Sequence, residues 1–219
     1  MSNAKPIDLA YNLDPTTPVY PNDPPVAVQI LESTRYTRTD GRPSLNCSKI
    51  TAGIHCGTHM DAPFHFFENG ITIDQVPLEV CVGQALMIDV RNTLVNGMIE
   101  VQHLKPQEAR IRELHRIVLH TGWYRQWGKP EFFTSHPVFT PKAAQFLVDC
   151  GVRLVAVDFP SVDRAPFPVH IALLSKGIII VENLTNLAAV KNEVFNLVVL
   201  PLKFTGRDGS PVRAIALED

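Results

Sequence analysis

The sequence predicts an α/β fold in which one compact domain is built around a mixed, largely buried sheet. Short apolar runs rich in β-branched residues recur between residues 85 and 200, as expected of strands that are covered on both faces. Helix-like stretches alternate with these runs, which is typical of crossover units that join parallel strands. The length of 219 residues suffices for one full hydrophobic core, so we expect a single domain over residues 1–219.

Five segments are predicted to be strands of this sheet. Each is short and apolar at most positions, which favours a strand buried on both faces. The five segments are residues 85–90, 117–120, 152–157, 177–181 and 197–200. A further strand-like run, residues 48–54, lies nearer the N-terminus.

The clearest helix is predicted over residues 141–150. Thr140 can serve as the N-cap, Pro141 suits the first turn, and Gly151 can adopt the left-handed conformation that ends a helix. Because the predicted strand at 152–157 follows directly, this helix and strand form the second half of a crossover unit.

The first 45 residues are predicted to form an extended, proline-rich N-terminal arm. Prolines disfavour a helix and push the residues before them into extended conformations. They stand at positions 15, 18, 21, 24 and 25. The chain has no low-complexity tract, so we expect a rigid surface segment rather than a disordered linker.

Composition and charge argue against nucleic-acid binding and against a membrane segment. The chain has 20 basic and 22 acidic residues and a formal net charge of −2, so it lacks the basic stripe that binds nucleic acid. It has no signal-peptide pattern and no run of 18 apolar residues, so we expect no membrane segment and a cytoplasmic protein.

The four cysteines, at positions 47, 56, 81 and 150, form no C-x-x-C pair. This spacing indicates free thiols in a reducing compartment and excludes a zinc site built from cysteines. Cys56 lies between candidate metal ligands, but a free cysteine is more often a small packed residue.

The strongest signal for chemistry is a cluster of metal-ligating residues within eleven positions. His55, His59, Asp61 and His65 combine imidazole nitrogens with a carboxylate, a combination that suits Zn²⁺, Mn²⁺ or Fe²⁺. Any one of these histidines alone is more often a packed core or loop residue. Because Gly57 disfavours a regular helix here, we expect a tight loop after the run at 48–54, and one loop can place several ligands at small entropic cost.

The segment from His55 to His65 resembles the H-x-G-T-H-x-D-x-P-x-H motif of the putative cyclase family, which includes bacterial kynurenine formamidases and isatin hydrolases. The resemblance extends over nearly the whole chain. His170 and Glu182 match the distal ligand pair of the family. Other segments that resemble the family are 18–25, 121–123 and 157–163, together with 200–204 and 210–214, which correspond to its last two strands.

The resemblance implies roles for six residues. His55, His59 and Asp61 would bind one divalent ion, and Asp61, His170 and Glu182 would hold a second, with Asp61 as the bridge. His65 would be the catalytic proton-transfer group beside the metal-bound water. The implied cofactor is Zn²⁺ or Mn²⁺, with one or two ions per chain, because histidine and aspartate suit both metals.

The family fold implied by the resemblance is a compact α/β domain of the swivelling β/β/α type. The family commonly assembles into dimers or larger oligomers, so we expect a homodimer or homotetramer. In such assemblies the N-terminal loop can contribute to the site of a neighbouring subunit.

The implied activity is metal-dependent hydrolysis of an amide-type C–N bond in a small molecule. An aryl formamide such as N-formylkynurenine is the first candidate substrate, and a cyclic amide of the isatin type is the alternative. An aryl group needs aromatic contacts, and the candidates for substrate binding are Tyr20, Phe66, Trp123 and Phe159.

Two other classes of function fit part of the pattern. His59, Asp61 and His170 also satisfy the facial triad of a non-haem iron oxygenase, although that class usually has an all-β barrel. A non-catalytic metal-binding protein is the other class, but structural zinc sites are normally closed by four protein ligands and favour cysteine. The additional His65 therefore favours the hydrolase.

Overall fold

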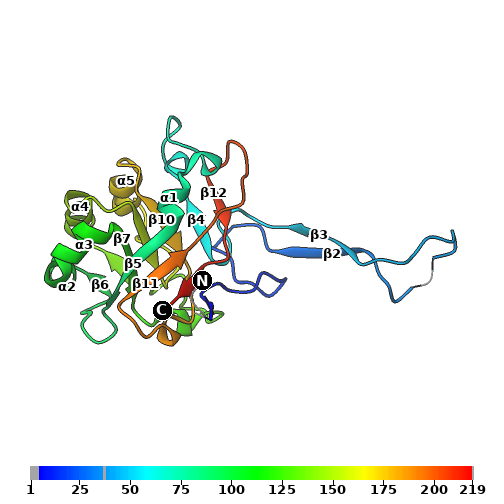
Figure 1. Ribbon diagram of the computed structural model, residues 1–219, viewed down its shortest axis with the longest axis horizontal. Helices are drawn as coiled ribbons and strands as arrows, with labels where there is room; N and C mark the ends of the chain where they lie inside the picture. Colours follow the sequence, from blue (N-terminus) through cyan, green and yellow to red (C-terminus); the bar gives the residue numbers. More distant parts are fainter. Residues whose placement is uncertain (1–4, 37, 219) are drawn as a thin grey trace.

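The computed structural model describes residues 5–36 and 38–218, and its central element is a nine-stranded mixed sheet. The sheet curls into half a barrel (Figure 1). Its strands, in spatial order, are β1 (Ile7–Asp8), β13 (Ile215–Leu217), β11 (Val194–Val198), β5 (Val82–Asp89), β7 (Arg116–His120), β9 (Leu154–Val157), β10 (Ile179–Glu182), β4 (His59–Asp61) and β12 (Gly209–Pro211).

The centre of the sheet is parallel and its two edges are antiparallel. Strands β5, β7, β9 and β10 pair in parallel, and each successive pair is joined by a connection that contains a helix. These helices are α3 (Glu108–Leu114), α4 (Pro141–Asp149) and α5 (Pro168–Leu174). The predicted α/β class with a mixed sheet is confirmed.

The remaining elements are short. The helices are α1 (Leu78–Cys81) and α2 (Val101–Leu104), with the 3-10 turns η1 (Pro63–His65), η2 (Ile73–Gln75), η3 (Lys105–Gln107), η4 (Trp123–Gln126) and η5 (Leu187–Ala189). The two small sheets are β2 (Ala27–Glu32) with β3 (Cys47–Thr51), and β6 (Met98–Ile99) with β8 (Val138–Phe139).

Helix α4 forms as its sequence predicts. The Thr140 side chain accepts a hydrogen bond from the Ala143 N–H, with an N···O distance of 3.2 Å. Pro141 occupies the first position of the helix, and Gly151 has a φ of +72° just beyond its end. The capping residues therefore define both ends of this helix.

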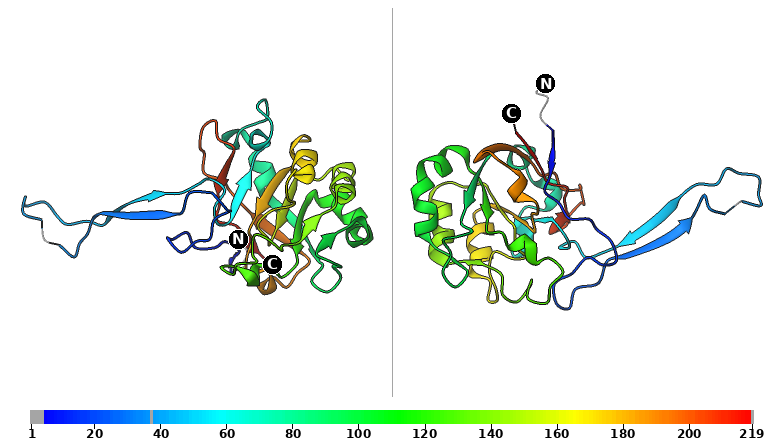
Figure 2. Two further views of the ribbon diagram at one scale, coloured as in Figure 1. Left: turned by 180° about the vertical axis from the view of Figure 1, so that it is seen from behind. Right: turned by 90° about the horizontal axis from the view of Figure 1, so that it is seen from below.

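Both faces of the central sheet are buried, because its strands are covered on each side. Helices α2 to α5 gather on one side (Figures 1 and 2), where they pack on Ile117, Val155 and Ile180. The alternate residues of the same strands, such as Val118 and Val181, face a second cluster that also contains residues of α1, η2 and η5. All residues of β9 and β10 are buried, as predicted for these runs.

The predicted boundaries and two predicted segments need correction. The strand predicted at 197–200 begins at Val194, and the one predicted at 177–181 begins at Ile179. Residues 200–204 do not form one of the last two strands, since only Pro201 makes an isolated bridge, to Val212. Proline has no N–H to donate to a ladder, which limits pairing there.

The motif segment also differs from the predicted tight loop. Strand β3 ends at Thr51, a loop carries His55, and residues 59–61 then form β4 inside the main sheet, between β10 and β12. Met60 is fully buried in the second core cluster, so this strand is anchored by the residue between the two candidate ligands.

The N-terminal part of the chain contains β1 and a long hairpin. Strand β1 pairs with β13 at the edge of the sheet, whereas β2 and β3 pair with each other and project from the body (Figures 1 and 2). No helix occurs in the described residues before Pro63. Residues 1–4 and Thr37 of the predicted arm lie outside the described part of the chain.

The structure bears on two expectations, that the chain has no membrane segment and that its cysteines are free thiols. Within these residues, no helix combines the length and apolar character that crossing a membrane requires. All four cysteines lie in the described part of the chain and none of them forms a disulfide.

Candidate metal centre

Strand β4 places two candidate ligands on one face of the sheet. Because side chains alternate along a strand, His59 and Asp61 point to the same side while Met60 points into the core. Glu182, at the end of β10, is the cross-strand neighbour of His59. His170 comes from α5, so the sheet and one crossover helix bring together residues that are far apart in the sequence.

The first group of potential ligands consists of His55, His59 and Asp61. One ligand atom from each lies within 4.8 Å of the others. The Asp61 Oδ1 atom is 2.7 Å from His55 Nδ1 and 3.4 Å from His59 Nε2. A small cation between these three atoms would be bound by two imidazoles and one carboxylate.

The second group consists of Asp61, His170 and Glu182, and one ligand atom from each again lies within 4.8 Å of the others. His170 Nε2 lies 3.8 Å from Asp61 Oδ2 and 3.4 Å from Glu182 Oε1. The second Glu182 oxygen lies 3.4 Å from His59 Nε2. Asp61 belongs to both groups, with one oxygen turned to each, so it has the geometry of a bridge.

Each of the three histidines is fixed by a hydrogen bond at the ring nitrogen that faces away from these groups. His59 Nδ1 donates to the Gly57 carbonyl at 3.0 Å, and His170 Nδ1 donates to Asp163 Oδ1 at 2.5 Å. His55 Nε2 donates to Asp208 Oδ2 at 2.6 Å. Carbonyls and carboxylates only accept, so these outer nitrogens carry their protons, and a bound cation would take the place of any proton on the opposite nitrogens, as is usual around metal-binding histidines.

The electrostatics of the site favour positive charge. Asp61 and Glu182 are almost fully buried, and although burial opposes ionisation, contacts with the histidines keep both pKa values below the usual range. Burial also opposes protonation of His55 and His170, but the surrounding carboxylates raise the pKa of each to about 10. The protonated histidines balance the buried carboxylates here, and a divalent metal ion, which this nitrogen and oxygen donor set fits, would supply the same positive charge in place of the protons.

His65 lies beside these groups rather than inside them. It ends η1, its side chain is 29% exposed, and its ring centroid is 4.0 Å from that of His55. Burial lowers the pKa of His65, against the opposing charge of Asp61. The imidazole is therefore neutral at neutral pH and can accept a proton.

A cavity of about 290 Å³ opens onto the potential ligands. Its aromatic wall consists of two pairs of rings: Tyr20 with Phe133, at a centroid distance of 5.7 Å, and Phe66 with Phe167, at 5.6 Å. The polar residues Ser161 and Asn183 also line it. The cavity lining thus combines aromatic rings with potential metal ligands, and small-molecule sites commonly combine apolar walls with a few polar groups.

Of the four aromatic residues predicted to contact substrate, two line this cavity and two do not. Tyr20 and Phe66 belong to its wall. Phe159 is fully buried in the core next to Phe139, and Trp123 packs against the same core while its indole N–H donates to the Phe132 carbonyl at 3.1 Å.

Several residues at the site had no predicted role. Phe133 and Phe167 complete the aromatic wall, and Asp163 and Asp208 hold the outer nitrogens of His170 and His55. Asp163 stands seven residues before His170, a spacing that could have suggested a contact across the start of α5. Asp208 is 153 residues from His55, and no local pattern indicates that contact.

Comparison with known proteins gives matches over nearly the whole chain. The sequence model of the family described as putative cyclase matches residues 7–164. A kynurenine formamidase from Geobacillus thermodenitrificans (strain NG80-2) is 35% identical over 212 residues, which cover 95% of both chains. A kynurenine formamidase from Bacillus cereus (strain ATCC 14579) is 34% identical over 219 residues, which cover 98% of both.

Solved structures share the fold. An isatin hydrolase bound to the product analogue thioisatinate superposes with a TM-score of 0.84 and 23% identity, covering 98% of this chain and 92% of that one. A protein from Bacillus stearothermophilus, described as a predicted metal-dependent hydrolase, gives a TM-score of 0.75 and 27% identity over 100% of both chains.

Proposed function

This chain belongs to the putative cyclase family, and we propose that it is a metal-dependent hydrolase of an amide-type C–N bond, with an aryl formamide such as N-formylkynurenine as substrate. The observation that carries the proposal is that the clustered His, Asp and Glu groups line the same cavity as the aromatic wall. The kynurenine formamidase relatives, which match nearly the full chain, support the choice of an aryl formamide.

The proposed cofactor is one or two ions of Zn²⁺ or Mn²⁺. His55, His59 and Asp61 would hold the first ion, and Asp61, His170 and Glu182 the second. A divalent ion held there would lower the pKa of a coordinated water, to about 7 for Zn²⁺, and would polarise the substrate carbonyl.

The residues of the chain would then transfer a proton and position the substrate, and proton transfer is the task of His65. His65, neutral at neutral pH and at the edge of the cavity, accepts a proton from the attacking water and passes it to the departing nitrogen. The water oxygen bonds to the formyl carbon, the C–N bond breaks, and formate and an aryl amine leave.

The aromatic wall would position the aryl group. Tyr20 meets Phe133, and Phe66 meets Phe167, both edge to face, and Phe66 also stacks on the His170 ring at 5.1 Å. A flat aryl ring can pack against these faces and edges, which orients the formamide toward the charged side of the cavity. Trp123 and Phe159 belong to the core and do not line the cavity, so any effect on substrate would pass through residues that do.

A comparison of substrates tests the proposal. With metal-loaded protein, we expect kcat/KM for N-formylkynurenine to exceed that for isatin by about 10-fold or more, because the relatives that match nearly the full chain are kynurenine formamidases. Preference for isatin would favour the cyclic-amide alternative. Oxygen consumption with Fe²⁺ would favour an oxygenase, and tight metal binding without hydrolysis of any amide would favour a non-catalytic protein.

Two structural features argue against the alternatives from other classes. The facial-triad oxygenases are usually all-β barrels, whereas the candidate ligands here lie on an α/β sheet with crossover helices. A structural zinc site is closed by protein ligands, whereas the potential ligands here line an open cavity.

We also propose that the protein assembles as a homodimer or homotetramer through the β2–β3 hairpin. Val28, Ile30 and Ile50 lie on one face of this hairpin and are 42%, 71% and 62% exposed. A lone two-stranded hairpin is marginally stable in water, and an exposed apolar stripe indicates a contact surface. A second copy of the chain would cover this stripe.

The change Ile30→Asp tests the assembly. A charge at Ile30, the most exposed residue of the stripe, should weaken the contact, so the variant is expected to elute as a monomer where the unchanged protein is a dimer or tetramer, as measured by gel filtration with light scattering. Val95→Asp is the matched control, because Val95 is also apolar and 67% exposed but lies outside the hairpin. An unchanged protein that is monomeric, or an Ile30→Asp variant that assembles normally, would contradict this proposal.

We propose that residues 1–219 form one domain of the swivelling β/β/α type, with residues 1–45 as its N-terminal arm, and that the protein acts in the cytoplasm. The curled mixed sheet and the reduced cysteines of the described residues support these proposals.

A further inference from the structure

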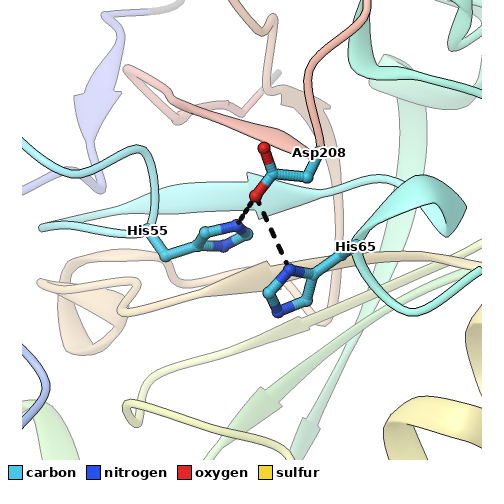
Figure 3. A group of neighbouring side chains, drawn as sticks. All are labelled: His55, His65 and Asp208. Carbon is cyan, nitrogen blue, oxygen red and sulfur yellow. Dashed lines mark hydrogen bonds and ion pairs between the residues drawn. The ribbon is translucent and has the colours of Figure 1, made fainter. Parts of the chain in front are cut away.

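The contact between Asp208 and two of the motif histidines suggests a role for a residue outside the motif. Figure 3 shows the Asp208 carboxylate above the two imidazoles, with dashed lines to both. Its Oδ2 atom accepts from His55 Nε2 at 2.6 Å and lies 3.7 Å from His65 Nδ1. One oxygen therefore faces a candidate metal ligand and the candidate proton-transfer group at once.

The backbone around Asp208 is held firmly against the motif. The Asp208 carbonyl accepts from the Ala62 N–H at 2.9 Å, and the Arg207 carbonyl accepts from the Ile73 N–H at 2.8 Å. Gly206 donates to Asp74 Oδ1 at 2.9 Å. These three hydrogen bonds join the segment before β12 to residues 62–74, so the carboxylate has a defined position.

Gly209 permits this close approach. A Cβ atom at Gly209 would lie 2.6 Å from the Met60 carbonyl oxygen and 2.9 Å from His55 Cε1, closer than real contacts allow. Only glycine lets β12 pack this closely on β4 and on the His55 ring. Gly209 therefore allows the close packing of β12 on β4 that brings the neighbouring Asp208 to the site.

We propose that Asp208 is a positioning residue of this site, which orients His55 so that Nδ1 faces the metal position and places a negative charge beside His65 for proton transfer. The inference rests on the proposed function. A carboxylate that accepts from the outer nitrogen of a metal-binding histidine fixes its ring and tautomer, and a carboxylate beside a general base stabilises the imidazolium that forms. Asp163 stands in the same relation to His170, so the site would have one such carboxylate on each side.

The change Asp208→Ala removes this carboxylate and can be tested without relying on activity. We expect the affinity for Zn²⁺ or Mn²⁺, measured by competition with a chelator, to fall about 10- to 100-fold with the same number of ions bound at saturation. Asp208→Asn keeps a neutral acceptor and should lose less affinity. Asp74→Asn is the matched control, because Asp74 holds the same loop through Gly206 but does not face His55 or His65.

Kinetics at saturating metal tests the contact with His65. We expect Asp208→Ala to lower kcat by about 10-fold or more with little change in KM, and to lower it no further in a protein that already carries His65→Ala. Unchanged metal affinity and kcat would overturn the proposal, as would a full additional loss of kcat in the His65→Ala background. Loss of one bound ion at saturation would also overturn it, because Asp208 would then be a ligand.

The affinity measurement separates this inference from the proposed function. If the unchanged protein binds metal but hydrolyses no formamide, the proposed function fails while the affinity of Asp208→Ala still tests the orientation of His55. If the unchanged protein is an active formamidase and Asp208→Ala retains its affinity and kcat, only the inference about Asp208 fails.

Discussion

Asp61→Asn is expected to remove the metal and abolish hydrolysis together. Asp61 is 1% exposed and is the one residue shared by both groups of potential ligands. Asparagine has nearly the same size but loses the negative charge and one acceptor oxygen, so it can neither bridge two ions nor balance their charge. Loss of a residue that only hydrogen-bonds a metal ligand lowers metal affinity by at most about 100-fold. We expect Asp61→Asn to lower the affinity by more than this, and hydrolysis to fall with it.

Elemental analysis and a formamidase assay on the same purified sample test this prediction. Asp149→Asn is the matched control, because Asp149 is exposed at the end of α4, where its side chain accepts a hydrogen bond from Gln145. Circular dichroism should show that both variants are folded. If Asp61→Asn keeps its full metal content, Asp61 is not the bridge.

His65→Ala is expected to give the opposite combination, with metal retained and turnover lost. The His65 ring lies outside the two buried ligand groups but lines the cavity beside them. Removing a general acid-base group commonly costs about 10²- to 10⁴-fold in rate, and we expect kcat to fall by at least about 10²-fold. KM should change much less, since proton transfer acts on the transition state rather than on substrate binding.

The control for this variant is His103→Ala, a half-buried histidine in α2 whose side chain only accepts from the Glu100 N–H. Metal content and kcat are measured on both proteins. If His65→Ala loses metal as well as turnover, His65 is a ligand. The group His55, His65 and Asp208 would then be the metal position to consider, because its ligand atoms also lie within 4.8 Å of one another.

The parallel centre of the sheet could be predicted because its signals are local. The runs that become β7, β9 and β10 are apolar on both faces, and the caps of α4 lie within a few residues of the helix. Such patterns need no knowledge of distant contacts. Strand β4 lacks this signal, because His59-Met60-Asp61 has one apolar residue between two polar ones. Its pairing with β10 and β12 makes it a strand, and that pairing spans more than a hundred residues.

The candidate site likewise contains residues that a local pattern indicates and residues that only distant contacts bring together. The spacing of His55, His59 and Asp61 indicates a metal site by itself, whereas His170 and Glu182 were connected to it only by resemblance to the family. Their physical connection depends on the crossover through α5 and the register of β10 with β4. Asp208 had no signal at all, because it reaches His55 through the pairing of β12 with β4.

The aromatic wall was the least predictable part of the site. Tyr20 and Phe66 line the cavity, but so do Phe133 and Phe167, which come from irregular segments between elements. Phe159 follows a buried strand and enters the core instead. Composition shows that aromatic residues are available, but loop conformation decides which of them face a cavity.

Whether the protein is a metal-dependent formamidase is tested by the metal content of protein purified without added metal, combined with formamidase activity before and after chelation. We expect about one or two equivalents of a divalent metal, and hydrolysis that a chelator removes and Zn²⁺ or Mn²⁺ restores. Protein that binds no metal under any loading condition, or that hydrolyses N-formylkynurenine equally well after the metal is removed, would contradict the account.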